Sequence, residues 1–277
     1  MRLPSDMPEF APGTVWLAGA GPGDPGLLTL HVLNALAQAD VVVHDALVGP
    51  DILGLARVGS VLEYAGKRGH KTSTKQTEIC ARLIALARRG KRVLRLKGGD
   101  PLVFGRGGEE ALALVRAGIP FRILPGISSG VGGLAYAGIP VTHRTTNSAV
   151  TFVTGHDQRG RLPADLDWEA LAKGSPVIVV YMGLRHAAEI TERLRAAGRA
   201  PTEPVAIVSD ASLPTQQVLE TDLGRAAADV AAAGLSAPAL VVVGEVVRLR
   251  AAMDWVGALS GRVLVAADGP LMAEGGA

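Results

Sequence analysis

One stretch of the chain, residues 94–110, limits the possible folds more than any other. It begins within an apolar run at 92–96 that predicts a buried strand, and it continues through a glycine-rich loop until a helical pattern resumes near Glu109. Open α/β folds place their ligands where a strand ends in such a loop and feeds a helix. Glycine lets a backbone approach a ligand closely, and Asp100 and Arg106 add one charge of each sign. The stretch predicts a ligand-binding loop, with an ordinary surface connection as the alternative.

Short apolar runs alternate with helical patterns over residues 14–137, which predicts about five βα units. The first half is therefore expected to form a parallel sheet covered by helices on both faces, with strands at 14–17, 41–44, 60–64, 92–96 and 121–124. The segment 138–147 interrupts this pattern. We expect an N-terminal α/β domain at 12–142, a C-terminal α/β domain at 148–250, and terminal extensions at 1–11 and 261–277.

In the second half, apolar runs again alternate with helical patterns, but the last strands include one that is expected to be antiparallel. Strands are predicted at 149–154, 177–181 and 204–209, followed by an antiparallel strand at 218–221 and a last strand at 238–243 that closes the sheet. Small residues follow or begin several of these strands, namely Gly155, Gly183, Ala211 and Ala239. Such a rim suits a flat, partly apolar ligand.

A second glycine-rich turn, residues 19–25, superficially matches a dinucleotide-binding turn after a strand. The match is weak because Pro22 lacks the N–H that a phosphate would use. Asp45 follows ~20 residues later, where an acidic side chain can bind a ribose hydroxyl. It fits equally well in a catalytic cleft at the carboxyl end of its strand.

Two further loops leave alternatives open. The basic segment 66–76 is either a solvated lid or a clamp for carboxylates or phosphates, in which Arg68 can form bidentate pairs. The hydroxyls of Ser128 and Ser129 either cap a helix or hold a ligand carboxylate or ribose.

Composition excludes several classes of protein. A hydrophobic content of 48% with 19% charged residues describes a core-forming chain, and no apolar run is long enough to span a membrane. The single cysteine, Cys80, excludes an internal disulfide and a cysteine-rich metal site, so a cytoplasmic enzyme without a metal is expected. Residues 1–150 carry 17 Lys/Arg against 11 Asp/Glu, whereas residues 151–277 carry 11 against 15. The basic half suggests an anionic ligand, and the scarcity of aromatics argues against nucleic acid.

Taken together and in order, the motifs resemble the tetrapyrrole methylase family. The segments that carry the resemblance are GAGPGDPGLLTL at 19–30, HDALV at 44–48, GKR at 66–68, RLKGGDPLVFGRGGEE at 95–110, PGISS at 125–129, AGIPVTHR at 137–144, TGH at 154–156 and YMG at 181–183. The resemblance implies two α/β domains of the class III methyltransferase type, with the active site in a trough between them, and a homodimer. It also implies the cofactor S-adenosylmethionine. The residues that match the family's cofactor contacts are Pro22, Gly98, Gly99, Asp100, Ser128, Ser129, Met182, Ala211 and Ala239.

Within the family the motifs are most similar to those of members that methylate uroporphyrinogen III at C2 and C7. The eight carboxylates of that substrate would account for the basic N-terminal half, and the expected substrate contacts are Lys67, Arg68, Arg106, Arg144 and Met182. The family's candidate for removing the proton matches Arg106, with Glu109 nearby. Because arginine is a poor base, we expect Arg106 mainly to orient substrate, with Asp45 as a second catalytic candidate. Two alternatives are a sister methylase that acts on a later precorrin, on diphthine or on ribosomal RNA, and a binding module without turnover.

Overall fold

A computed structural model describes residues 4–66, 76–157 and 159–265. The chain divides into two compact units, Met1–Ser128 and Ser129–Ala277. This division lies before the linker at 138–147 that the sequence pattern suggests. The division lies earlier because α5 (Leu134–Tyr136) packs with the rest of the second unit. Trp255 Nε1 donates a hydrogen bond to the carbonyl oxygen of Ala135 at 2.9 Å. Gln216 Nε2 donates one to the carbonyl oxygen of Tyr136 at 3.0 Å.

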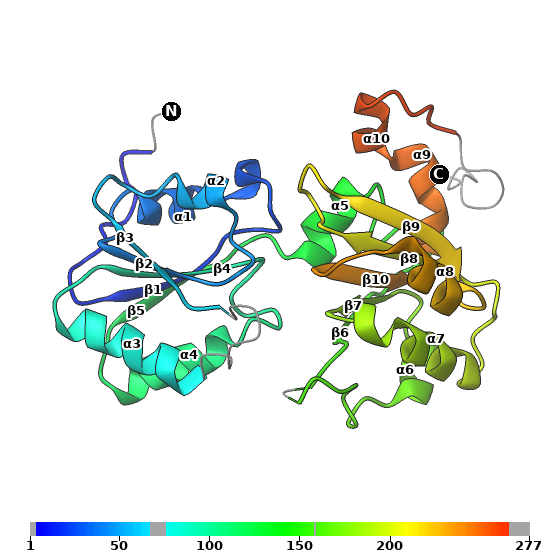
Figure 1. Cartoon of the computed structure of the whole chain (residues 1–277), viewed down its shortest axis with the longest axis horizontal. Helices are drawn as coiled ribbons and strands as arrows, with labels where there is room; N and C mark the ends of the chain where they lie inside the picture. Colours follow the sequence, from blue (N-terminus) through cyan, green and yellow to red (C-terminus); the bar gives the residue numbers. More distant parts are fainter. Residues whose placement is uncertain (1–3, 67–75, 158, 266–277) are drawn as a thin grey trace. The chain divides into compact units, whose positions relative to one another are not determined.

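The first unit is a five-stranded sheet in which all pairings are parallel, in the order β3-β2-β4-β1-β5. The strands are β1 (Val15–Gly19), β2 (Val41–His44), β3 (Val61–Tyr64), β4 (Val93–Lys97) and β5 (Phe121–Leu124). The helices are η1 (Pro25–Leu27), α1 (Leu30–Leu36), α2 (Pro50–Leu53), α3 (Gln76–Arg88) and α4 (Gly107–Arg116). Figure 1 shows α1 and α2 on one face of this sheet and α3 and α4 on the other. The predicted parallel sheet with two covered faces is confirmed.

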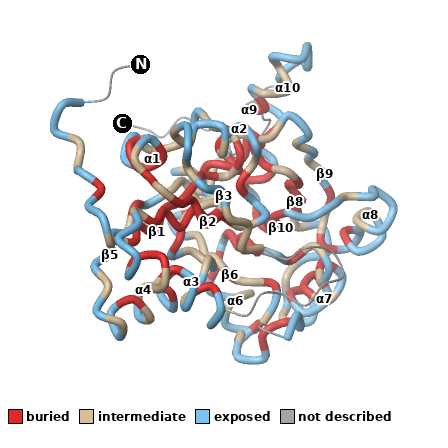
Figure 2. The backbone as a smooth tube through the Cα atoms, turned by 60° about the vertical axis from the view of Figure 1, so that its left-hand side comes forward, coloured by how far each residue is buried: buried red, intermediate tan, exposed pale blue. Residues whose placement is uncertain are grey.

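The core of the first unit follows from the alternation of side chains along its central strands. In β1, Trp16 and Ala18 belong to one buried apolar cluster, whereas Val15 and Leu17 belong to another. The first cluster includes side chains of α1 and α2, and the second includes side chains of α3 and α4. Since successive side chains of a strand point to opposite faces, an all-apolar strand requires cover on both. Figure 2 shows β1 and β2 as buried along their lengths.

The second unit is a five-stranded mixed sheet in the order β6-β7-β10-β8-β9. Its strands are β6 (Thr151–Thr154), β7 (Ile178–Tyr181), β8 (Pro204–Ser209), β9 (Gln217–Asp222) and β10 (Ala239–Val243). The predicted antiparallel strand is confirmed as β9, which pairs with β8. The expectation that the last strand closes the sheet is wrong, because β10 lies between β7 and β8 and is antiparallel to both. All five residues of β10 are buried, which suits a central position.

The helices of the second unit lie around this sheet, and the last three follow β10. They are η2 (Ser129–Gly133), α5, α6 (Trp168–Gly174), η3 (Leu184–His186), α7 (Ala187–Ala196), α8 (Ala226–Ala233), η4 (Glu245–Leu249), α9 (Arg250–Met253) and α10 (Trp255–Leu259). Asp254, only 3% exposed, accepts hydrogen bonds from Arg250 and Arg262, and Arg250 also pairs with Glu220 of β9. These ion pairs fix the C-terminal helices to the sheet.

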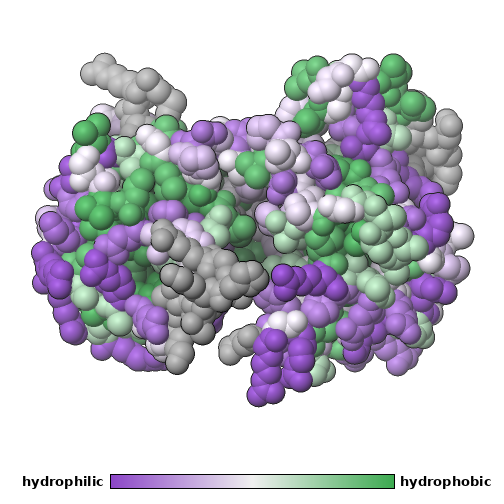
Figure 3. Space-filling view, viewed as in Figure 1, coloured by the Kyte–Doolittle hydropathy of each residue, from purple (hydrophilic) through white to green (hydrophobic). Residues whose placement is uncertain are grey.

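The surface of the first unit carries exposed apolar side chains near its edge strand. Val61 and Leu62 of β3 are about half exposed, and the preceding Val58 is almost fully exposed. Figure 3 shows apolar residues over this part of the unit. Among the helices of the described residues, none combines the length and apolar character needed to cross a bilayer.

Candidate functional site

The predicted site residues of the first unit gather at one edge of its sheet. Because all five strands run parallel, their carboxyl ends share that edge. The loops that leave it hold Pro22 after β1, Asp45 after β2, Gly98, Gly99, Asp100 and Arg106 after β4, and Ser128 after β5, while Glu109 lies in the first turn of α4. Lys67 and Arg68 lie outside the described residues.

Three glycine loops meet at this edge at backbone contact distance. A Cβ on Gly19 would lie 2.4 Å from the carbonyl oxygen of Gly99, and a Cβ on Gly126 would lie 2.2 Å from the same atom. Gly99 also exchanges two backbone hydrogen bonds with Gly21, at 2.7 and 3.2 Å. The Gly21 N–H is therefore engaged, and the turn leads into a three-residue η1 instead of a long helix. This geometry disfavours a dinucleotide phosphate at the first glycine turn.

Two aspartates organise the backbone of the same loops. One Asp45 oxygen accepts a hydrogen bond from Leu47 N at 3.0 Å, and the carboxylate lies 3.3–3.4 Å from Gly98 N. The carboxylate of Asp100 accepts from Leu102 N at 2.8 Å and from Gly126 N at 3.0 Å. Both carboxylates bridge neighbouring loops, and each retains lone pairs for a ligand.

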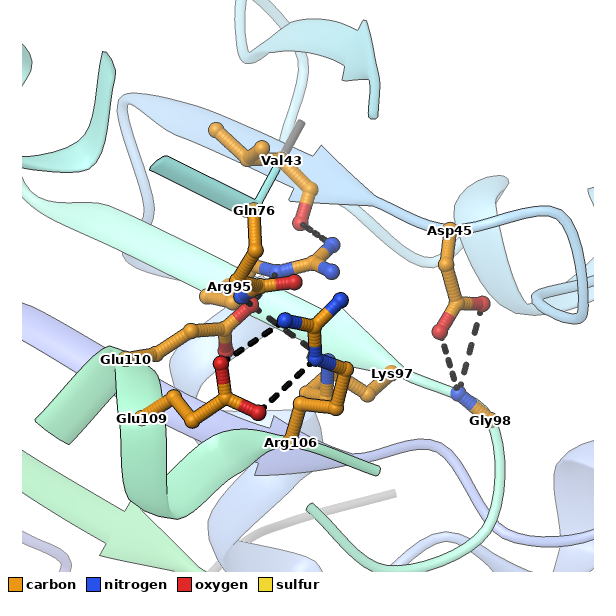
Figure 4. Close-up of polar contacts among 9 residues, drawn as sticks. All are labelled: Val43, Asp45, Gln76, Arg95, Lys97, Gly98, Arg106, Glu109 and Glu110. Carbon is orange, nitrogen blue, oxygen red and sulfur yellow. Dashed lines mark hydrogen bonds and ion pairs between the residues drawn. The ribbon is translucent and has the colours of Figure 1, made fainter. Parts of the chain in front are cut away.

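Arg106 and Glu109 form a bidentate pair at the start of α4 (Figure 4). Arg106 Nε donates to one Glu109 oxygen at 2.9 Å and Nη2 donates to the other at 2.7 Å. Both side chains are about half exposed, so the fork faces solvent at the carboxyl edge. The hydrogen bond from Arg106 lowers the pKa of Glu109, and the same bond raises the pKa of Arg106. The neutral form of Arg106, which alone could accept a proton, is thus even scarcer than that of a free arginine.

Glu110, next to Glu109, is directed into the protein. It is fully buried, and its Oε1 accepts from Gln76 Nε2 at 2.9 Å and from Arg95 Nε at 3.0 Å, with Lys97 Nζ at 3.4 Å (Figure 4). Burial lowers the pKa of Lys97, and the neighbouring Arg95 lowers it further. This cluster anchors the first turn of α4 to β4, directly beneath the Arg106–Glu109 fork.

In the second unit, the predicted site residues also share one sheet edge. Met182 follows β7, Ala211 follows β8, and Ala239 begins the antiparallel β10, so all three lie at the same edge. Met182 is 40% exposed, whereas the two alanines are nearly buried. Ser129 is the first residue of η2. Arg144 is exposed in a turn closed by the bridge between His143 and Asn147.

Backbone strain marks the same loops independently of any motif. The non-glycine residues with positive φ among those that the structure describes are Phe104, Arg106, Met182, Asp210 and Ser212, with φ between 49° and 65°. The first two lie in the central glycine loop, and the other three follow β7 and β8. Such conformations cost free energy and concentrate at functional sites. The strained positions therefore coincide with the predicted ligand loops.

Several residues that build these loops were not identified from sequence. The buried set comprises Arg95, Lys97, Glu110 and Tyr181. Arg95 and Lys97 do carry a signal, because two cations at alternate positions of an otherwise apolar strand require a buried counter-charge on one face. Nothing in the pair Glu109–Glu110 tells which of the two is buried.

Comparisons with known proteins agree with this geometry. Residues 14–227 match the family model described as tetrapyrrole (corrin/porphyrin) methylases. The chain belongs to this family. It is 67% identical over 260 residues to a uroporphyrinogen-III C-methyltransferase of Sinorhizobium sp, covering 94% of this chain and 93% of that protein. It is 50% identical to siroheme synthase 1 of Yersinia enterocolitica, covering 88% of this chain and 51% of that protein, so it spans about half the length of that relative.

A solved structure extends the comparison to the fold. The uroporphyrin-III C-methyl transferase from Thermus thermophilus, complexed with S-adenyl homocysteine, is 41% identical and superposes with a TM-score of 0.75. The alignment covers 85% of this chain and 99% of that one. The predicted family and its α/β fold with two sheets are confirmed.

The residues present fit a cofactor of the S-adenosylmethionine type. The loops offer glycine backbone at Gly98 and Gly99, the carboxylate lone pairs of Asp100, and a partly exposed thioether at Met182. Ala211 and Ala239 contribute no bulk at their edge. In the first unit the carboxylate suits a cationic ligand better than a polyphosphate, and in the second unit the small, apolar residues suit a partly apolar ligand.

Proposed function

We propose that this chain is a uroporphyrinogen-III C-methyltransferase. It transfers methyl groups from S-adenosylmethionine to C2 and C7 of uroporphyrinogen III, giving precorrin-2 by way of precorrin-1. The product would enter the synthesis of sirohaem, cobalamin or haem d1. The observation that carries the proposal is the 67% identity to the Sinorhizobium protein across nearly its full length. The strained loops at both sheet edges agree with it.

The cofactor contacts we propose are Pro22, Gly98, Gly99, Asp100, Ser128, Ser129, Met182, Ala211 and Ala239. Bound S-adenosylmethionine supplies an electrophilic methyl group on a sulfonium centre. The protein's contribution is to hold the cofactor loops at fixed spacing and to exclude water. The backbone contacts among Gly19, Gly99 and Gly126 supply that rigidity in the first unit.

The substrate contacts we propose are cationic, because uroporphyrinogen III carries eight carboxylates. Arg106 and Arg144 present exposed guanidinium groups, and Lys67 and Arg68 are assigned from the family motif alone. Met182 provides an apolar contact for the macrocycle. A planar guanidinium fork matches a carboxylate bidentately, as the Arg106–Glu109 pair already does within the chain.

The chemistry needs no metal and no covalent intermediate. A pyrrole β-carbon attacks the methyl group, the sulfur keeps the electron pair of the broken bond, and one proton leaves the macrocycle. Arg106 orients substrate, since its fork with Glu109 favours the protonated guanidinium. Asp45 lies at the same sheet edge, where its carboxylate can face the pyrrole N–H groups.

A sister methylase that acts on a later precorrin is the alternative, and no observation in this chain favours it. We also propose that the enzyme is a homodimer, from the family resemblance, and that it is cytoplasmic and binds no nucleic acid, from its composition. Analytical ultracentrifugation of the purified chain tests the dimer directly.

The decisive experiment is an anaerobic incubation of the enzyme with freshly generated uroporphyrinogen III and methyl-labelled S-adenosylmethionine. We expect two labelled methyl groups on the macrocycle, identified by product mass. Cofactor binding without transfer to this substrate would reject the proposed substrate while leaving the family assignment intact.

A further inference from the structure

Tyr181, the last residue of β7, has no role in the proposed reaction, yet it joins several loops of the second unit. Its side chain is 8% exposed, and its hydroxyl oxygen accepts a hydrogen bond from Gly130 N at 2.9 Å. Gly130 belongs to η2, a single π-helical turn that begins at Ser129. The first N–H groups of such a turn have no partner within it, so the tyrosine oxygen supplies one.

Besides the hydrogen bond, η2 and Tyr181 pack so closely that only glycine fits at the contact. A Cβ on Gly130 would lie 2.2 Å from the Tyr181 hydroxyl oxygen and 2.8 Å from Cζ. At the other end of the turn, a Cβ on Gly133 would lie 2.7 Å from the Cβ of Ala211. The turn is thus wedged between Tyr181 and Ala211, with no space for a side chain at either contact.

The backbone of Tyr181 holds another loop. Its carbonyl oxygen accepts from Gly155 N at 2.6 Å, and a Cβ on Gly155 would lie 2.4 Å from the Cα of Gly183. Met182, between Tyr181 and Gly183, has a φ of 56°. Tyr181 therefore contacts η2, which begins with Ser129, and directly precedes Met182, while η2 in turn lies against Ala211.

We infer that Tyr181 is a positioning residue whose hydroxyl sets the spacing between the η2 turn and the Met182 loop, and that it thereby determines affinity for S-adenosylmethionine. The inference rests on the proposed function for the identity of the ligand. Tyr181 takes no part in the transfer step, because its oxygen is committed to Gly130.

The test is Tyr181→Phe, which removes the acceptor and keeps the ring. We expect the dissociation constant for S-adenosylhomocysteine and the KM for S-adenosylmethionine to rise about tenfold, the size expected when a buried N–H loses its partner. The kcat at saturating cofactor should stay within about twofold of the parent value, and the KM for uroporphyrinogen III should rise less than that for S-adenosylmethionine, because Met182 is only one of several proposed substrate contacts. Calorimetry with S-adenosylhomocysteine gives a readout that does not depend on turnover.

Phe152→Leu is the matched control. Phe152 packs edge-on against the Tyr181 ring at 5.8 Å between centroids, so this change disturbs the ring and leaves the hydroxyl in place. We expect its affinity for S-adenosylhomocysteine to equal that of the parent. Gly130→Ala should weaken binding by steric conflict, and its effect should be less than additive with that of Tyr181→Phe, because both act on one contact.

Three outcomes overturn the inference. The first is an unchanged affinity for S-adenosylhomocysteine in Tyr181→Phe, and the second is an equal loss of that affinity in Phe152→Leu. The third is a general loss in Tyr181→Phe, in which kcat and both KM values change together and the Tm falls. The parent enzyme separates the inference from the proposed function. If the parent neither binds S-adenosylhomocysteine nor methylates uroporphyrinogen III, the proposed function fails. If the parent does both and the Tyr181 variant matches it, only the inference fails.

Discussion

Arg106 combines three properties that rarely occur in one residue. Its φ is 60°, it precedes the first turn of α4, and its guanidinium is held by both oxygens of Glu109. A half-exposed arginine in a strained conformation is costly to maintain without a function. Glu109 holds the guanidinium in place, and the N–H groups that Glu109 leaves unused can orient a carboxylate of the substrate.

Arg106→Lys tests this role at the level of a single residue. We expect the variant to bind S-adenosylhomocysteine as the parent does and to lose most of its turnover, because an ammonium cannot reproduce the planar fork. The measurement is kcat for methyl transfer alongside calorimetry. Arg116→Lys, at the exposed end of the same helix, is the control and should leave both quantities unchanged. Full turnover in Arg106→Lys would remove Arg106 from the reaction.

The elements of the first unit meet through glycines whose backbones touch. The loops after β1, β4 and β5 come within contact distance at Gly19, Gly99 and Gly126. We predict that Gly19→Ala destabilises the protein by about 3 kcal/mol or more, because the new methyl group would meet backbone atoms that cannot rotate away. Gly108→Ala in α4 has open space around its Cβ and should stabilise by about 0.5–1 kcal/mol. Chemical denaturation measures both, and equal stabilities for the two variants would contradict the packing described.

Asp40 gives the first unit a dependence of stability on acid. Its carboxylate joins the start of β2 to Arg92 and Arg57, and the hydrogen bond from Arg92 is the main reason that its pKa falls from 3.8 to about 2. Because the folded-state pKa is the lower one, the stabilisation is complete above about pH 4 and is lost as the pH falls toward 2. A shift of this size corresponds to at most ~2.5 kcal/mol. Exposure of both arginines reduces it to about 1 kcal/mol.

Asp40→Asn should therefore flatten the decline in unfolding free energy between about pH 4 and pH 2. Asp51→Asn, at an exposed position in α2, is the control and should decline as the parent does. Urea titrations at several pH values give the comparison. A decline in Asp40→Asn as steep as that of the parent would exclude Asp40 as the source.

At the scale of the whole molecule, charge is distributed unevenly along the chain. Residues 1–150 carry an excess of Lys and Arg, whereas residues 151–277 carry an excess of Asp and Glu. Attraction between exposed charges weakens as salt shortens the Debye length. We predict that the KM for uroporphyrinogen III rises steadily with ionic strength, while affinity for S-adenosylhomocysteine changes little. Arg144→Gln should reduce that salt dependence, and a salt-independent KM would contradict an electrostatic role for the basic half.

Much of the fold was predictable because it depends on local patterns. The parallel sheet of the first unit follows from apolar runs that alternate with helical periods, and the ligand loops follow from glycine, proline and charge at strand ends. The antiparallel β9 was predictable for the same reason. The position of β10 was not, because an all-apolar strand is equally compatible with any central place in a sheet. The predicted site residues of each unit gather at its sheet edge, yet their roles stay predictions.

By itself, then, the sequence determined the kind of sheet, the loops that carry function and the family to which the chain belongs. Only the tertiary structure decided that Glu110 is buried while Glu109 pairs with Arg106, and that the Tyr181 hydroxyl meets Gly130. Local patterns fix a residue's face and conformation through interactions with near neighbours in the chain. Contacts such as that of Tyr181 with Gly130 join residues far apart in sequence, and they exist only once packing has set the register and the order of the strands.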